Sequence, residues 1–125
     1  MKLKQALTEN PFYSRYYDLI RERVVLMDGG MGTCLQAENL GVEDFGGADL
    51  EGCNENLNLP RPDVIRKIHQ DYFEAGADVV ETNTFGATPL VLAEYGLQDK
   101  AREINIRAAQ LAKEASENLS KSNCL

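Results

Sequence analysis

Long apolar runs are absent from this sequence. No stretch of its 125 residues approaches the roughly 18–20 apolar residues of a transmembrane helix, and Met1–Leu7 has no apolar core of signal-peptide length. Basic residues are also few, with 13 Lys and Arg against 20 Asp and Glu and a net charge of −7. Nucleic acids and anionic membranes attract clustered Lys and Arg, so we expect neither as a partner. We expect a cytoplasmic protein.

Cysteine and histidine are too sparse to form a familiar metal-binding pattern. The three cysteines, Cys34, Cys53 and Cys124, are widely spaced, without C-x-x-C or a Cys/His pair at zinc-finger spacing. In a reducing compartment they are expected to be free thiols, with Cys34 in a packing role. The only histidine, His69, lies among polar neighbours beside a helical apolar face, so we expect it at or near the surface.

The sequence does contain two short apolar segments that each end in polar residues. Val24–Met27 lead into Asp28 and then three glycines within four positions, which predicts a strand over 24–28 and an exposed turn after it. Glycines there permit positive φ and a close approach of a ligand to the backbone. A second strand is expected over 78–82, with a loop over 83–88.

Helical patterns occupy most of the remaining chain. The spacing of apolar residues, prolines and glycines predicts helices over 11–23, from about 62 to Gly76, from Thr88 to Gly96, and from about 99 to 117. Residues 34–58 lack any periodicity and are expected to form a long, functional loop. Residues 1–10 and 118–125 are expected to be polar tails around a folded portion at 11–117.

Strands that alternate with helices predict an α/β fold with a parallel sheet. Two strands have open edges and cannot cover several helices. We therefore expect this chain to be the N-terminal piece of a larger protein, truncated before a third strand.

The carboxyl ends of parallel strands lie on one face, so the two polar clusters should converge. One cluster is Asp28 with Gly29, and the other contains Glu81, Thr82, Asn83 and Thr84. A carboxylate suits an ammonium group, and backbone amides and hydroxyls suit a carboxylate, so the set can hold a zwitterion. A phosphate or a metal-bound water is an alternative, and Glu81 could instead be a structural carboxylate. Neither G-x-G-x-x-G nor G-x-x-x-x-G-K-[ST] occurs.

Three stretches resemble the homocysteine S-methyltransferase domain family, in particular the N-terminal module of the cobalamin-dependent methionine synthases. They read VLMDGGMGT at 25–33, NLNLPRPDVI at 56–65 and YFEAGADVVETNTFGA at 72–87. The resemblance covers about residues 15–117. It implies the first two β/α units, with a preceding helix, of a (β/α)8 TIM barrel.

The resemblance also implies a site. Asp28 and Gly29 would contact the amino-acid end of homocysteine, and Thr82, with Asn83 and Thr84, would contribute from the second strand end. In this family a zinc ion held by cysteines on later strands activates the thiol for methyl transfer. Those ligands have no counterpart here, and neither Cys34 nor Cys53 matches their positions. We therefore expect the chain alone to be inactive, with zinc, and cobalamin and methyltetrahydrofolate in a methionine synthase, belonging to the full-length enzyme.

Two other functions remain open. The chain could be an interaction module that folds with a partner, such as the downstream modules of a longer protein, or that self-associates through its open strand edges. It could also be a fragment of another barrel that binds a phosphorylated ligand at the Asp28 turn. The identity of the methyl donor is not encoded in these residues.

Overall fold

The computed structural model describes residues 11–122, and side chains from 15 to 119. Its helices are α2 (Pro11–Glu22), α3 (Met31–Ala37), α4 (Val42–Phe45), α5 (Pro62–Glu74), α6 (Pro89–Leu92) and α7 (Ala101–Ser122). Single 3₁₀ turns lie between them: η1 (Ala48–Leu50), η2 (Asn54–Asn58), η3 (Ala93–Tyr95) and η4 (Gln98–Lys100). Cys124 and the expected tail at 1–10 lie outside the described residues. No helix in the described part combines the length and the apolar character of a membrane span.

Local signals set most helix ends as predicted. Pro62 occupies the first turn of α5, and Gly76 follows it with φ 108°, in the left-handed region that favours glycine. The Thr88 hydroxyl accepts a hydrogen bond from Val91 N at 3.3 Å and caps α6. Helix α7 runs on through Ser122, beyond its predicted end at 117, and the polar tail at 118–125 stays a prediction.

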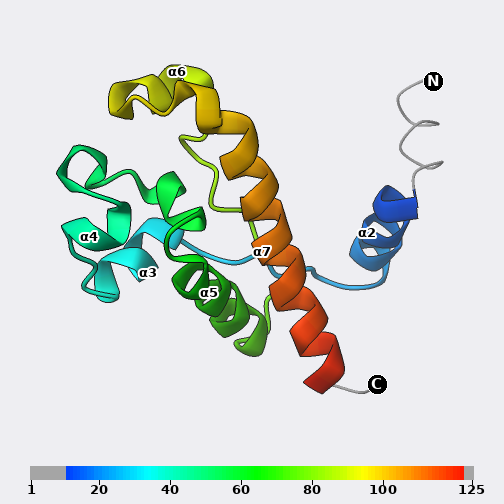
Figure 1. The fold of residues 1–125 in the computed structure, drawn as a ribbon. Coiled ribbons are helices and arrows are strands. Elements are labelled where there is room, and N and C mark those ends of the chain that lie inside the picture. The colour runs from blue at the N-terminus through cyan, green and yellow to red at the C-terminus, as the bar shows by residue number, and fades with distance from the viewer. Residues whose placement is uncertain (1–10, 123–125) are drawn as a thin grey trace, which may run out of the picture.

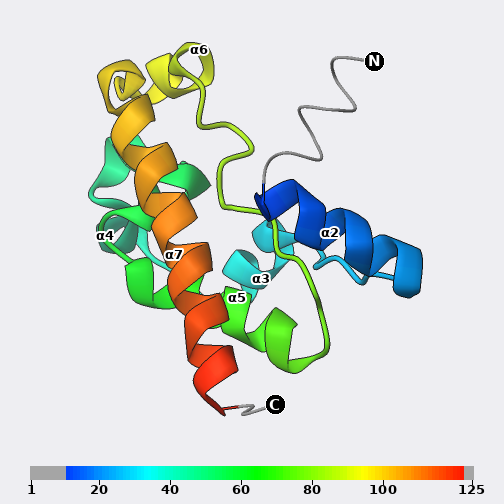
Figure 2. The same ribbon diagram turned by 90° about the vertical axis from the view of Figure 1, so that its right-hand side faces the viewer.

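Helices α5 and α7 pack side by side and form the centre of the molecule (Figures 1 and 2). The predicted stripe of α7 is buried at every position: Ala101, Ile104, Ala108, Leu111 and Ala115. Leu111 joins Ile65 and Ile68 of α5 in one core cluster, which also takes in Leu35 and Phe45. We call residues 31–119 the body.

Residues 34–58 belong to this core, and the prediction of an irregular loop is wrong. The segment consists of the short helical turns α3, α4, η1 and η2, and it buries Phe45 and Leu57 at 8% and 0% exposure. Gly46 and Gly52, with φ of 98° and 86°, help to close these turns. Because each of these helical pieces spans at most seven residues, too few for an apolar stripe to recur along it, no periodicity appears in the sequence.

The two predicted strands are reduced to one bridge. Among the described residues no strand forms, and the two segments meet only at a parallel bridge between Met27 and Val79. Around it, Asp28 N donates to Val79 O at 3.0 Å and Val79 N donates to Leu26 O at 3.2 Å. A strand gains its ladder and packing from neighbouring strands, and no other described segment pairs with these two. The parallel direction agrees with the prediction, whereas the β/α units themselves are not formed.

Residues 11–27, here called the arm, extend away from the body. Helix α2 stands apart and is joined to it by an extended segment (Figure 1). None of the described side chains of the arm is buried, and Val24 and Leu26 are 79% and 54% exposed. Its main attachment is Asp78, whose carboxylate accepts two hydrogen bonds from Arg23, at 2.8 and 2.5 Å, and one from Leu26 N at 2.9 Å.

Candidate functional site

Asp28 is the last residue before a tight turn that leads directly into α3. Gly30 is the N-cap of α3, with an ordinary φ of −66°. The expectation that these glycines permit positive φ is therefore wrong: the left-handed glycines of the described chain lie elsewhere. At Gly29 the turn passes close to Tyr72, and a Cβ there would lie 3.0 Å from the Tyr72 hydroxyl, so a larger residue would require this side chain to shift.

Tyr72 of α5 stabilises this turn through its hydroxyl group. Its hydroxyl donates to Gly30 O at 3.2 Å and lies 3.4 Å from the Cys34 sulfur. The contact with Cys34 raises the pKa of Tyr72, and burial and the Asp28 charge raise it further, so the hydroxyl stays protonated and able to donate. Cys34 thus has a packing contact, as expected. Burial likewise raises the pKa of the Cys53 thiol, which fits a structural residue.

The second polar cluster meets the first, as the sequence predicted. Glu81 N donates to Asp28 Oδ2 at 3.0 Å. The hydroxyls of Thr82 and Thr84 lie 2.8 Å apart. Residues 28–32 and 81–85 together line one cavity of about 250 Å³. The structure therefore brings all six predicted site residues to a single place: Asp28, Gly29, Glu81, Thr82, Asn83 and Thr84.

The site residues differ in which polar atoms remain free to contact a ligand. Oδ1 of Asp28 makes no hydrogen bond with any described residue, and Glu81 is exposed. Asn83 is only 5% exposed, and its side-chain amide donates to Asn54 O at 2.8 Å and to Asn58 Oδ1 at 3.3 Å. Because both amide hydrogens are used, Asn83 anchors its loop through its side chain.

The residues that hydrogen-bond to the backbone of the loop over 83–87 were not predicted from the sequence. Asn58 donates to Asn83 O, Glu55 accepts from Gly86 N, and Asn105 of α7 donates to Ala87 O, at 2.9, 2.8 and 2.7 Å. The available signal was the recurrence of asparagine at every second position of Asn54–Asn58, inside a segment that otherwise resembles a surface loop.

His69 was also misplaced, since it is fully buried on α5 rather than at the surface. Neither of its ring nitrogens has a hydrogen-bond partner within residues 11–122. Burial lowers the pKa of His69, and the nearby Asp28 carboxylate opposes this only in part. The ring is therefore neutral at pH 7, and the polar neighbours of His69 in sequence gave no sign of it.

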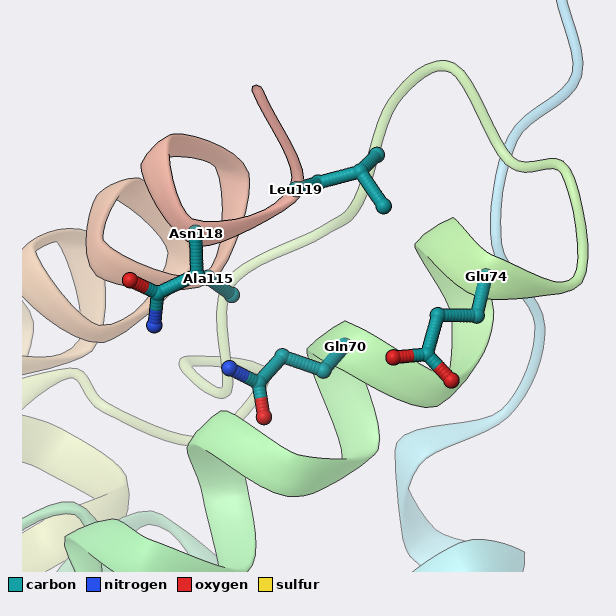
Figure 3. Close-up of a pocket in the computed structure, with 5 residues that line it drawn as sticks. All are labelled: Gln70, Glu74, Ala115, Asn118 and Leu119. Carbon is teal, nitrogen blue, oxygen red and sulfur yellow. The ribbon is translucent and has the colours of Figure 1, made fainter. Parts of the chain in front are cut away.

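Other hollows also carry polar side chains, among them one of about 360 Å³ lined by Gln36, Asn39, Glu51 and Asn54, but they contain no predicted site residue. A cavity of about 180 Å³ lies between the C-terminal parts of α5 and α7, where Gln70, Glu74, Ala115, Asn118 and Leu119 surround it (Figure 3). One of about 350 Å³ lies between α3 and α5, beside Cys34 and Tyr72. Neither contains a predicted site residue.

The chemistry of the Asp28 cavity favours a ligand with a cationic group. Its lining carries two carboxylates, Asp28 and Glu81, and no Lys, Arg or His. Two negative charges repel a phosphate, whereas Asp28 can accept from an ammonium group. A metal ion has no evident site, because no group of three His, Cys, Asp or Glu side chains among the described residues could hold one.

Comparison with known proteins shows the family to which the chain belongs. The fold is similar to a crystal structure of the homocysteine methyltransferase MmuM from Escherichia coli in its metallated form, with a TM-score of 0.69 and 28% identity over 85% of this chain and 35% of that one. The fold is therefore that of part of a known methyltransferase structure. The family model for homocysteine S-methyltransferase matches residues 25–124, and the chain belongs to this family.

Curated relatives are much longer than this chain. The methionine synthase of Mycobacterium tuberculosis is 48% identical over 102 residues, which are 82% of this chain and 8% of that protein. The methionine synthase of Mycobacterium leprae is 44% identical over 114 residues, 91% of this chain and 9% of that protein. The chain therefore spans less than a tenth of the length of these two relatives.

Proposed function

We propose that this chain forms the homocysteine-binding end of a homocysteine S-methyltransferase of the methionine synthase type. The convergence of Asp28 with Glu81–Thr84 on one cavity carries the proposal. The family membership and the likeness to methionine synthases support it. In the larger protein, the Met27 and Val79 segments would become the first two strands of a (β/α)8 barrel, and 11–117 would be its opening portion.

Each proposed site residue has a role suited to one end of an amino acid. Oδ1 of Asp28 accepts from the ammonium group, and Oδ2 remains on Glu81 N. The carboxylate of the ligand receives hydrogen bonds from the backbone at Gly29 and from one hydroxyl of the Thr82–Thr84 pair, because the other hydroxyl donates within the pair. Asn83 holds the loop that carries these hydroxyls. Glu81 lies at the exposed rim, where it disfavours anionic ligands.

Methyl transfer itself belongs to the whole enzyme in this proposal. Zinc does not fit the described residues, since they contain no three-residue ligand set. No step is therefore assigned to this chain beyond binding and orienting homocysteine. Zinc, cobalamin and methyltetrahydrofolate, together with the downstream modules, are proposed for the full-length protein. A cytoplasmic location stays a prediction.

Calorimetric titration of the chain with L-homocysteine tests the binding role. We expect wild type to bind homocysteine, and Asp28→Asn to weaken binding about tenfold or more, because a hydrogen bond to a charged group contributes about 1.5–3 kcal/mol. Asp49→Asn is the matched control, since Asp49 is an exposed aspartate outside the cavity. Binding of inorganic phosphate in place of homocysteine, or equal affinity in Asp28→Asn, would contradict the proposal.

An interaction module is the second candidate, and the exposed apolar residues of the arm favour it. Val24, Leu26 and Met27 are all more than half exposed, in an extended segment that forms one bridge and leaves its other edge unpaired among the described residues. Self-association through this edge predicts a mass that rises with protein concentration in sedimentation equilibrium. A constant monomer mass would remove this candidate and leave the homocysteine proposal intact.

A further inference from the structure

The loop that carries Thr82 and Thr84 is a compact unit held from outside. We call residues 82–87 the site loop. Inside it, Thr84 N donates to Thr82 O at 2.8 Å and Ala87 N donates to Thr84 O at 3.1 Å. These bonds fix the shape of the loop, but they cannot fix its position relative to Asp28.

One anchor is a carboxylate. Glu55 Oε1, from η2, accepts from Gly86 N at 2.8 Å. The approach is close, because a Cβ on Gly86 would lie 3.1 Å from this oxygen and 3.2 Å from Val91 Cγ1. Gly86 is itself buried. A charged acceptor on a buried backbone amide makes one of the stronger hydrogen bonds in proteins.

The second anchor is a reciprocal pair of asparagines. Asn58 donates from its side chain to Asn83 O at 2.9 Å and accepts from Asn83 Nδ2 at 3.3 Å. Asn83 also reaches Asn54 O at 2.8 Å. Asn58 is 0% exposed, so this network is shielded from water. A loss of either partner would leave buried polar atoms without hydrogen bonds.

These two anchors come from η2 and act on Asn83 and Gly86, on either side of Thr84, while Asn105 of α7 adds a third contact at Ala87 O. We propose that η2 is a positioning element of the site, in which Glu55 and Asn58 hold the site loop so that the Thr82 and Thr84 hydroxyls face Asp28. Neither residue lines the cavity. As far as it concerns the ligand, this inference rests on the proposed function. It gives η2 a role in affinity as well as in folding.

The test compares three substitutions at Glu55 with one control. Glu55→Ala removes the acceptor, Glu55→Gln retains an oxygen in the same place, and Glu55→Asp draws the carboxylate back by one methylene. Glu51→Ala is the control, because Glu51 is an exposed glutamate on the same segment without a contact to the site loop. Amide hydrogen exchange measured by NMR reports on the Gly86 N–H, and calorimetry reports on homocysteine binding.

We expect Glu55→Ala to speed exchange at Gly86 about tenfold, equivalent to about 1.4 kcal/mol. Homocysteine affinity should fall by about fivefold or more while the urea midpoint of the body changes little. Glu55→Gln should largely restore both properties, because its neutral side-chain oxygen can still accept from the Gly86 N–H; if only the charge mattered, this variant would behave like Glu55→Ala. Glu51→Ala should match wild type. If Glu55→Ala does not fold, Glu55→Asp should show the same direction of change.

Two results would overturn the inference. One is unchanged exchange at Gly86 in Glu55→Ala, which would mean that the carboxylate does not hold the loop. The other is faster exchange with unchanged homocysteine affinity, which would limit η2 to folding. If wild type binds no homocysteine, the proposed function fails, and the inference is then decided by the NMR shifts of Thr82 and Thr84. A change of these shifts in Glu55→Ala supports it, and their constancy rejects it.

Discussion

The arm and the body of this chain hold their residues in place by different means. The body buries apolar side chains in two core clusters, whereas no described side chain of the arm is buried. The arm is attached through one parallel bridge and the polar contacts of Asp78. Burial of apolar surface stabilises by about 25 cal/mol per Å², and exposed ion pairs contribute little. The two regions should therefore differ in stability.

The candidate site has one part next to the arm and one part anchored to the body. Asp28 follows directly after the arm, and its backbone N–H is bonded to Val79 O. The site loop is fixed to the core by Glu55, Asn58 and Asn105. One half of the cavity thus has a rigid support, and the other half follows an exposed segment. Binding at Asp28 should consequently respond to whatever covers the arm in a longer protein.

The largest expected effect is a loss of folding stability in the body. Leu111→Ala removes a fully buried side chain at the contact of α5 and α7, and it should destabilise the body by about 2–5 kcal/mol through lost burial and a cavity. Leu90→Ala, at a leucine that is 84% exposed, is the control and should change stability by less than about 0.5 kcal/mol. Urea unfolding followed by circular dichroism measures both. Similar losses in the two variants would contradict the description of the core.

A smaller effect on folding stability is expected at the buried histidine, His69, which lies near Asp28. His69→Leu replaces a ring whose nitrogens lack partners among the described residues, so it should stabilise the body by about 1 kcal/mol at pH 7. Because burial lowers the pKa of His69 from 6.5, the unfolded chain takes up the proton first as the pH falls. Wild-type stability should therefore decrease below about pH 6.5.

The variant should lack this decrease, and its advantage should grow between pH 7 and pH 5.5. Urea midpoints measured over this range supply the comparison, with pH 8 as the reference at which His69 is neutral in both states. A variant that is less stable than wild type at every pH would show that His69 makes a contact beyond the described residues.

The smallest effect on global stability, and the most local one, is expected at Asp78. Asp78→Ala removes the acceptor for Arg23 and Leu26 N, so the arm amides should exchange faster while the urea midpoint of the body is retained. Asp71→Ala, which breaks an ion pair within α5, should leave the arm unchanged. If Asp78→Ala unfolds the body as well, the arm and the body are one cooperative unit.

In wild type, low pH should detach the arm from the body in the same way as Asp78→Ala does. The hydrogen bonds from Arg23, with that from Leu26 N, lower the pKa of Asp78 from 3.8 to about 2. A carboxylate with a lowered pKa stabilises the folded attachment fully above its unfolded pKa and loses this contribution as the pH falls through its folded pKa. The arm should therefore stay attached above about pH 4 and detach between about pH 4 and pH 2, as hydrogen exchange at Leu26 can show.

Local patterns predicted the helices and the meeting of the two polar clusters. Pro62 and Gly76 delimit α5, Thr88 begins α6, and the small and apolar residues of α7 form its buried stripe. The parallel direction of the two segments placed Asp28 beside Glu81. The turns at 34–58 were missed because each is too short to show a period. The strands were overpredicted because apolar runs indicate what a segment prefers and not whether a neighbour pairs with it.

The sequence by itself determined where the chain turns and which residues could contact a ligand, since glycine, proline and apolar spacing act within a few residues. Only the tertiary structure decided that Gly29 makes room for Tyr72, that His69 is buried, and that η2 holds the site loop. Tyr72 lies 42 positions from Gly30, and Glu55 lies 31 positions from Gly86. Contacts over such separations depend on how the helices pack, and no local pattern encodes them.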